Sequence, residues 1–239
     1  MSVSFDPRIP VENRLLAALP TEEYSRLLPN LETVSLAFKQ VLYEPNEPIE
    51  HVYFPNNGVV SLVNIMQNGA TVEIATVGKE GMVGLPVFLE ADKIPGQAFS
   101  QVPGDAMRMK ADVFKDSVNR GGPLQNLLLR YTQTLFNFIA QSAACNSLHS
   151  IEQRCCRWLL ITHDRVERDE FPLTQEFLSQ MLGVRRAGVG EVAGNLQKAG
   201  LIRYSRGRMT ILDREGLKSA GCECYETVKQ EFDRLLGGN

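Results

Sequence analysis

The chain has 239 residues, of which 44% are hydrophobic and 22% charged, and its formal net charge is −3. This length fits one large or two modest domains with packed cores. There is no apolar run of about 18 residues, which excludes a membrane-spanning helix. Five cysteines, an odd number, argue against a disulfide scaffold. Residues 1–7 lack the basic start and apolar core of a signal peptide, so we expect a cytoplasmic protein.

The N-terminal part changes from helical to strand periodicity. Two short helices are expected at 13–19 and 21–28. Short strands are then expected at 33–38, 41–43, 51–54, 59–66, 71–77, 98–102 and 106–109. The turn signals Asn57-Gly58, Asn68-Gly69 and Pro103-Gly104 separate several of them. Many short strands joined by tight turns predict an antiparallel, jelly-roll-like β-roll over residues 1–122.

A long helix is expected to follow, from Pro123 to about Ser147, within a connecting segment at 123–149. Its apolar side chains recur at alternating spacings of four and three, the pattern of a helix–helix seam. A second apolar stripe contains Leu127, Leu129, Phe136 and Ile139, so one stripe can face the roll and the other a partner. We assign the seam to the interface of a parallel homodimer: Leu124, Leu128, Tyr131, Leu135, Phe138 and Ser142.

The C-terminal part, residues 150–239, contains a helix pair followed by a hairpin. After a helix at 150–165, Thr174 can cap a second helix that Gly183 ends. A third helix opens at Arg185 and runs to about Ala199. Strands at 201–204 and 208–212 flank a glycine-containing turn, and a helical stretch is expected from Arg214 to Leu236. The order predicts a winged helix-turn-helix and, overall, an α+β fold.

The charge of this part suits double-stranded DNA. Residues 1–122 carry ten Lys/Arg and fifteen Asp/Glu, a net of −5, whereas 183–218 carry eight against three, a net of +5. Arginines at the start of a recognition helix can read base edges, and basic residues of a wing can bind phosphates. The DNA-contacting positions are expected to be Thr174, Gln175, Arg185, Arg186, Val189, Arg203, Arg206 and Arg208. The alternative is that the helix pair is only a packing module.

Two runs carry a family resemblance: residues 182–189, LGVRRAGV, and 196–202, LQKAGLI. They resemble the winged helix of the cyclic-AMP receptor/fumarate-nitrate regulator (Crp/Fnr) superfamily of bacterial transcription factors, and the likeness extends from about Asn13 to Leu217. It implies a roll that holds an effector, dimerisation through the long helix, allosteric control and RNA polymerase as a candidate partner. Arg186 matches a family arginine, but Ala187 and Glu191 depart from the family pattern, so no operator sequence can be carried over.

The effector implied by the resemblance is not a cyclic nucleotide. Nucleotide-binding members have a glutamate after a glycine turn and an arginine that holds the phosphate. Here Gly84 matches the glycine, Leu85 stands in place of the glutamate, and no arginine lies near residues 97–100. An unpaired phosphate would cost several kcal/mol to bury. The pocket for an unidentified small molecule is expected at Gly81, Met82, Val83, Gly84 and Phe99.

The cysteines and histidines predict no metal and no cofactor. No cysteine precedes Cys145, whereas the iron–sulfur sensors of the superfamily use an N-terminal cluster. Cys222-Glu223-Cys224 is closer than the usual zinc spacing and lacks a nearby histidine in sequence, and His51, His149 and His163 are isolated. Structural cysteines are therefore expected, with a thiol switch as the alternative.

The sequence thus predicts a homodimeric, sequence-specific DNA-binding transcription regulator with an effector-sensing roll. The alternative from another class is a regulatory subunit whose winged helix binds protein rather than DNA. We do not expect an enzyme, because the sequence has no nucleophile elbow, Walker loop, metal-ligand set or paired-carboxylate motif.

Overall fold

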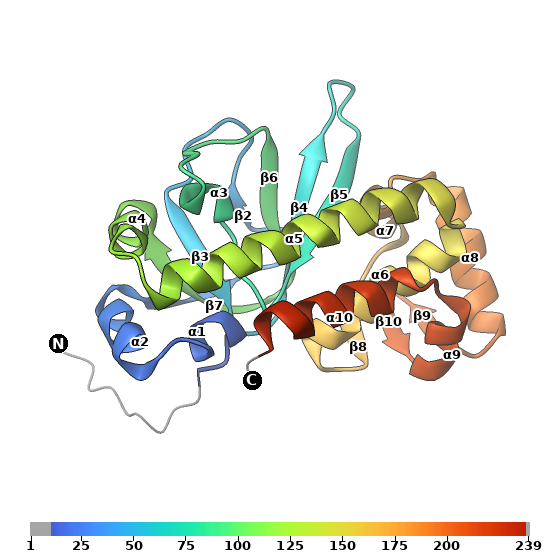
Figure 1. Cartoon of the computed structure of the whole chain (residues 1–239). Coiled ribbons are helices and arrows are strands. Elements are labelled where there is room, and N and C mark those ends of the chain that lie inside the picture. Colours follow the sequence, from blue (N-terminus) through green and yellow to red (C-terminus); the bar gives the residue numbers. More distant parts are fainter. Residues whose placement is uncertain (1–10, 238–239) are drawn as a thin grey trace.

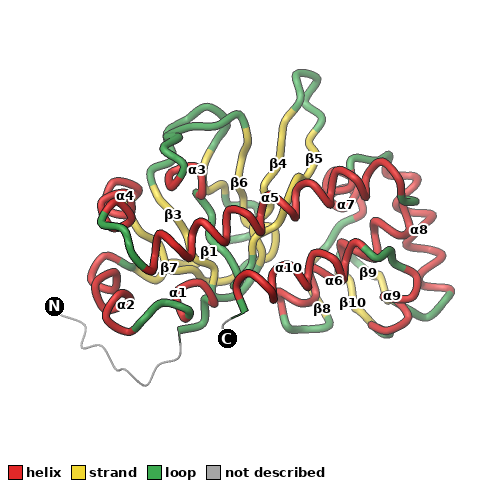
Figure 2. Tube along the Cα trace, viewed as in Figure 1, coloured by secondary structure: helices red, strands yellow, loops and turns green. Residues whose placement is uncertain are grey.

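A computed structural model describes residues 11–237 and shows the predicted α+β architecture. A β-roll lies at the N-terminal side, a long helix crosses it, and a winged helix-turn-helix lies at the far end of that helix (Figure 1). Figure 2 shows that strands dominate the roll and helices the C-terminal half. The ends of the predicted domains, residues 1–10 and 238–239, lie outside the described residues.

The N-terminal lead-in is fastened to the roll. It comprises α1 (Arg14–Ala17), α2 (Thr21–Leu27) and a 3-10 turn (Leu28–Asn30). Buried Asn13 caps α1, because its Oδ1 accepts the amides of Leu15 and Leu16. The amide of the same side chain donates to the carbonyls of Pro55 and Gly81, at 2.8 and 3.0 Å. One asparagine therefore joins the first helix to the end of β3 and to the loop at Gly81.

The roll consists of two antiparallel sheets. Its strands are β1 (Glu32–Leu36), β2 (Val41–Tyr43), β3 (His51–Pro55), β4 (Val59–Ile65), β5 (Thr71–Val77), β6 (Gly96–Val102) and β7 (Gly104–Lys110). One sheet has the order β1-β7-β3 and the other β2-β6-β4-β5. Every expected strand is present, with ends that differ by up to two residues. Gly69, with φ +80°, turns the β4–β5 hairpin where the Asn-Gly pair predicts it.

Two helices of the roll were not predicted. The short helix α3 (Leu85–Phe88) follows left-handed Gly84, and α4 (Ala111–Asn119) follows β7. Only Phe114 and Val118, four residues apart, are buried in α4, so its apolar stripe is too short to stand out in the sequence.

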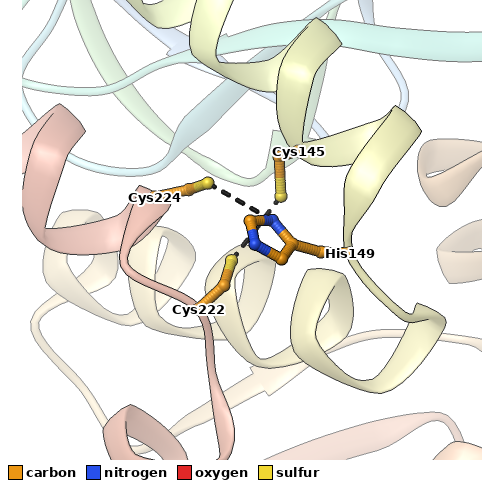
Figure 3. A group of neighbouring side chains, drawn as sticks. All are labelled: Cys145, His149, Cys222 and Cys224. Atoms are coloured by element: carbon orange, nitrogen blue, oxygen red, sulfur yellow. Dashed lines mark hydrogen bonds between the residues drawn. The ribbon is translucent and has the colours of Figure 1, made fainter.

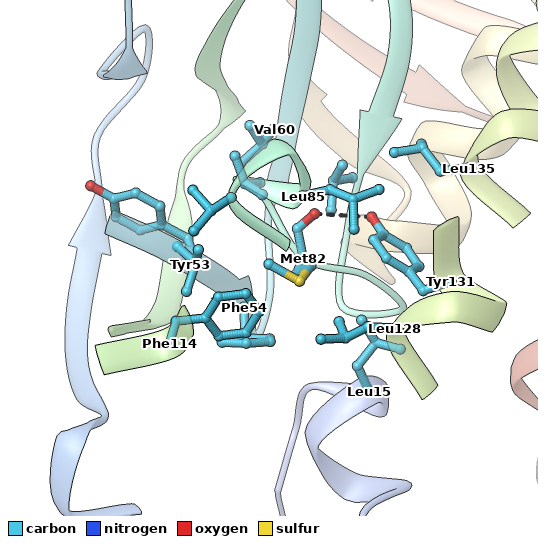
Figure 4. Close-up of a cluster of buried hydrophobic side chains, with 14 of the residues drawn as sticks. Leu15, Tyr53, Phe54, Val60, Met82, Leu85, Phe114, Leu128, Tyr131 and Leu135 are labelled. Carbon is cyan, nitrogen blue, oxygen red and sulfur yellow. Dashed lines mark hydrogen bonds between the residues drawn. The ribbon is translucent and has the colours of Figure 1, made fainter. Parts of the chain in front are cut away.

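The long helix α5 (Pro123–Leu148) begins and ends close to its predicted bounds, but its predicted seam faces the chain itself. The side chains of Leu124, Leu128, Tyr131, Leu135, Phe138 and Ser142 are all buried within the single chain, between 1% and 7% exposed. The Tyr131 hydroxyl donates to the Met82 carbonyl at 3.0 Å, and both residues lie in the core of the roll (Figure 4). Assigning the seam to a dimer interface was therefore wrong. The roll needs an apolar cover, and this stripe supplies it.

Of the second apolar stripe of α5, only two of the four side chains are exposed. Leu129 and Phe136 are 55% and 66% exposed, whereas Leu127 is buried and Ile139 half-buried. Two large apolar side chains one heptad apart are therefore more than half exposed to solvent.

The C-terminal half, as far as it is described, contains eight helices and strands. Its elements are α6 (Ile151–Val166), β8 (Glu170–Pro172), α7 (Gln175–Leu182), α8 (Arg186–Lys198), β9 (Ile202–Ser205), β10 (Arg208–Ile211), α9 (Arg214–Ala220) and α10 (Cys224–Leu236). The stretch expected as one helix is broken near Gly221 into α9 and α10. Helix α10 then runs back alongside α5 (Figure 1). Phe232 of α10 packs against Phe138 of α5 with ring centroids 6.2 Å apart.

The winged unit is docked on the roll. Phe177 of α7 packs edge-on against Phe99 of β6, with ring centroids 6.0 Å apart. Trp158 of α6 donates its indole N–H to Glu73 of β5 at 2.8 Å. Buried Arg165 forms an ion pair with Glu80 at 2.7 Å. Phe99, expected in the effector pocket, therefore belongs to the contact between the two halves.

No helix within residues 11–237 combines the length and the apolar character that crossing a bilayer would require.

Candidate nucleic-acid interface

The turn between α7 and α8 is built as the sequence predicts. Thr174 caps α7, because its hydroxyl accepts the Phe177 amide at 3.1 Å. Gly183 ends α7 at φ +63°, a left-handed conformation that favours glycine. The amide of Val184 then donates to the Ser179 carbonyl at 3.0 Å. These bonds fix the turn that sets the direction of the recognition helix.

Helix α8 separates a buried face from an outward face. Val189, Val192, Ala193 and Leu196 are buried beneath it. Arg185, Arg186, Ala187, Glu191 and Asn195 are exposed. Val189 is 1% exposed, so its expected contact with DNA was wrong: the side chain belongs to the core that holds α8 in place.

Three glycines, Gly188, Gly190 and Gly194, lie within α8. Glycine inside a helix costs roughly 0.5–1 kcal/mol relative to alanine, so repeated glycines need a reason. A Cβ on Gly194 would meet nothing within 4 Å, and one on Gly190 would lie 3.7 Å from the nearest atom, in Gln175. Packing therefore does not require them.

The wing extends the same surface. Ser205 pairs with Arg208, and Arg206 and Gly207 at φ +50° and +75° form a tight turn of the type expected for a hairpin. The Leu173 amide donates to the Gly207 carbonyl at 2.8 Å, which ties the tip of the wing to the start of α7. Thr174 and the wing turn are therefore neighbours.

The arginines of this surface differ in their partners. Arg208 forms an ion pair with Glu170 of β8 at 2.5 Å, with both side chains at least half exposed. Within residues 11–237, by contrast, no ion pair involves Arg185, Arg186, Arg203 or Arg206, and all four are exposed. Four guanidinium groups are therefore available to an external polyanion.

A cavity of about 300 Å³ lies between the roll, α3 and α5. Of the five residues expected to form the effector pocket, Met82 and Gly84 line it. Gly81 instead packs under the Tyr131 ring, where a Cβ would lie 2.4 Å from the hydroxyl, and Val83 pairs its backbone with that of Tyr53. The lining residues include no charged side chain, so the cavity has the chemistry of an apolar ligand site.

Comparison with known proteins agrees with this geometry. Residues 33–120 match the cyclic nucleotide-binding domain family, and residues 153–220 match the Crp-like helix-turn-helix domain family. The chain belongs to the Crp/Fnr superfamily of transcription regulators. A search among curated proteins found no match.

Solved structures of the superfamily share the fold of this Crp/Fnr regulator. One Crp/Fnr-family regulator from Eubacterium rectale superposes with a TM-score of 0.68 at 19% identity, over 86% of this chain and 96% of its own. FixK2 from Bradyrhizobium japonicum superposes with a TM-score of 0.68 at 14% identity, over 80% of this chain and 98% of its own. TTHB099 from Thermus thermophilus, a transcriptional regulator of the Crp family, superposes with a TM-score of 0.65 at 18% identity, over 78% of this chain and 95% of its own.

The cysteines of this Crp/Fnr regulator fall into two groups. Cys155 and Cys156 are buried in α6, and burial raises the pKa of both thiols, that of Cys156 to about 12. Such thiols remain protonated at neutral pH and are poor nucleophiles, which is the opposite of what a thiol switch requires.

The second group contains the other three cysteines together with a histidine that the sequence analysis described as isolated. His149 is not isolated: it lies with Cys145, Cys222 and Cys224 in one cluster (Figure 3). His163 also has partners, with Nε2 at 2.9 Å from Asp169 and Nδ1 at 2.8 Å from Arg214. The available sequence signal was Cys145 and His149, which are one helical turn apart at the end of α5 and therefore share a face.

Proposed function

We propose that this chain is a sequence-specific, homodimeric transcription regulator that binds double-stranded DNA through α8 and the wing. The observation that carries the proposal is the set of four exposed arginines without ion-pair partners among the described residues, on one surface built from α7, α8 and the β9–β10 hairpin. Arg185 and Arg186 lie at the N-terminal end of α8, which is the end that enters the major groove in helix-turn-helix proteins. Arg203 and Arg206 would bind phosphates beside it.

The second copy of the chain would dock on the exposed face of α5. Leu129 and Phe136 are the large apolar side chains of that face, and the buried seam behind them holds the helix rigid. A symmetric dimer through this helix would present two recognition helices to half-sites about 34 Å apart. Each subunit alone would contact only one half-site.

The effector of the roll would be an uncharged small molecule rather than a cyclic nucleotide. The cavity between the roll and α5 has no charged lining residue, so a phosphate placed there would lose its hydration without gaining a cation. Phe136 and Ile139 of α5 line this cavity, so a ligand there would contact the helix proposed to carry the dimer contact. This would couple ligand binding to the arrangement of the DNA-reading surface.

The test compares two charge reversals on the same helix. Duplexes bound by the wild-type protein are first selected from a random-sequence pool. Arg186→Glu should then lower affinity for a selected duplex by at least about 100-fold, since a bidentate arginine–base contact contributes roughly 1–3 kcal/mol and the new carboxylate repels phosphate. Lys198→Glu makes the same change in charge at the C-terminal end of α8 and should lower affinity much less. Unchanged affinity of Arg186→Glu, with native circular dichroism, would contradict the proposal.

A further inference from the structure

Three cysteines and one histidine converge where the two ends of the C-terminal half meet. Cys145 and His149 lie at the end of α5, and Cys222 and Cys224 lie at the start of α10, 77 residues further along the chain. The three cysteines are buried and form a small core cluster of their own, while His149 is half-buried. Figure 3 shows the three sulfur atoms and the imidazole ring directed toward one point.

Two of the distances between the four ligand atoms are close to those of a tetrahedral metal site. Cys145 Sγ lies 3.6 Å from Cys222 Sγ, Cys224 Sγ lies 3.5 Å from His149 Nδ1, and all four atoms fall within 4.8 Å of one another. Zinc–sulfur bonds of about 2.3 Å and zinc–nitrogen bonds of about 2.0–2.1 Å give tetrahedral edges of about 3.8 Å between sulfurs and about 3.5 Å from sulfur to nitrogen. The sulfurs are too far apart for a disulfide, whose bond measures about 2.05 Å.

We propose that Cys145, His149, Cys222 and Cys224 bind one zinc ion in a closed, four-coordinate structural site. Three sulfurs and one imidazole are a ligand set that zinc favours. The four side chains complete the coordination of the ion, so no position is left for water or substrate. On binding, each of the three thiols releases its proton to solvent and coordinates as a thiolate.

The groups around the cluster orient the ligands in the manner of a built metal site. With Nδ1 of His149 turned toward the sulfurs, its Nε2 faces the carboxylate of Glu223 at 3.4 Å. A carboxylate on the second nitrogen fixes the tautomer that leaves the first nitrogen free to bind a metal. The amide of Gln141 donates to Cys224 Sγ at 3.0 Å and would support a thiolate at that position.

The charge of the loaded site also matches its surroundings. One Zn²⁺ with three thiolates has a net charge of −1. The buried side chains of Arg154 and Arg157 lie close enough to Cys145 to interact with it electrostatically. Neither guanidinium has an ion-pair partner among residues 11–237, and Arg157 Nε has no hydrogen-bond partner there. Buried cations normally need a counter-charge, which the zinc–thiolate centre would supply.

The site would fasten the end of α5 to the start of α10. The helical stretch is interrupted at Gly221, between α9 and α10, and the Lys218–Glu226 ion pair at 2.9 Å already joins these two helices. A metal bridge at this point would hold α10 in its antiparallel position along α5, with the DNA-reading unit on the other side of the bridge. A zinc ion would thus act as a cross-link in a chain whose described cysteines are all free of disulfides.

The test uses the full chain, purified under reducing conditions and analysed for metal by mass spectrometry. We expect one zinc per chain, and after exchange into cobalt we expect the visible and thiolate-to-metal absorption bands of tetrahedral Co²⁺. Cys222→Ser and His149→Asn should each lose stoichiometric zinc. Cys155→Ala removes a buried thiol outside the cluster and should keep it.

Cobalt titration of the wild-type protein requires no variant, so a folding defect in Cys222→Ser would leave the proposal testable. The proposal is overturned if the reduced wild-type chain binds neither zinc nor cobalt stoichiometrically. It is also overturned if peptide mapping of the protein as isolated finds a Cys145–Cys222 disulfide, or if Cys155→Ala loses zinc as readily as Cys222→Ser. No DNA is present in these measurements, so they are independent of the DNA-binding proposal.

Discussion

Glu73 makes the contact between the roll and the winged unit sensitive to pH. Its carboxylate accepts the Ser61 hydroxyl at 2.7 Å and the Trp158 indole N–H at 2.8 Å, the latter across the boundary between the two halves. Burial raises the pKa of this carboxyl from its ordinary value of 4.5 to about 7, although the two donors and the nearby Arg165 and Arg157 favour the charged form. The carboxylate is therefore less stable in the folded chain than in water.

The sign and size of the effect follow from this shift. A carboxyl whose folded pKa exceeds its unfolded pKa contributes stability below the unfolded value, and this stability is lost as the pH rises through the folded value. A shift from 4.5 to about 7 corresponds to at most roughly 3 kcal/mol, since each pKa unit is about 1.4 kcal/mol. As the pH rises from about 5 to 7.5, the titration of Glu73 alone should lower the free energy of unfolding by about 2 kcal/mol.

The measurement is urea unfolding of the wild type and of Glu73→Gln at several pH values and one protein concentration. As the pH rises, the free energy of unfolding of the wild type should fall by about 2 kcal/mol more than that of Glu73→Gln. The difference between their urea midpoints should therefore change by roughly 1 M. Only the difference in pH dependence is interpreted, because glutamine both loses one of the two acceptor oxygens and removes the buried charge, and these effects oppose each other at any single pH. Parallel pH profiles for the two proteins would refute the reasoning.

Two further predictions concern the surfaces. Phe136→Glu, at a side chain 66% exposed, should convert the proposed dimer to monomer in analytical ultracentrifugation without loss of folding. Leu212→Glu, at a side chain 48% exposed in the winged unit, should leave the proposed dimer intact, and a dimeric Phe136→Glu protein would exclude this face. Arg206→Ala should weaken binding to all duplexes and reduce the salt slope by about one, because its guanidinium has no ion-pair partner among the described residues. Arg208→Ala should weaken binding less, and Glu170→Gln should strengthen it by freeing Arg208. Equal losses in the two arginine variants would show that the ion pair does not compete with phosphate.

The sequence predicted the elements whose signals are local. Periodicity and Asn-Gly turns located the strands of the roll, and a capping threonine, a terminal glycine and a hairpin turn located the winged unit. These features depend on residues within about a turn of one another, so they can be read without knowledge of the tertiary contacts. The positions of Arg186 and Arg206 on an exposed surface were predictable for the same reason.

What the sequence did not reveal depends on contacts between distant segments. Leu128 and Tyr131 form a seam that fits a partner helix and a β-roll equally well, and only the fold shows that the chain's own roll takes it. Val189 has the position of a groove-facing residue but serves the core. The i, i+4 spacing of Cys145 and His149 is readable from the sequence, but their proximity to Cys222 and Cys224 depends on α10 returning beside α5.

The docking of α7 on the roll bears on how this chain can be divided. Phe177 and Met181 are at most 4% exposed, and the hydrophobic cluster to which they belong also includes Val63 of β4. A C-terminal fragment that begins after α5 would expose these side chains to water as an apolar patch, which favours aggregation. We therefore expect the winged unit to be poorly soluble when it is expressed without the roll that covers this patch.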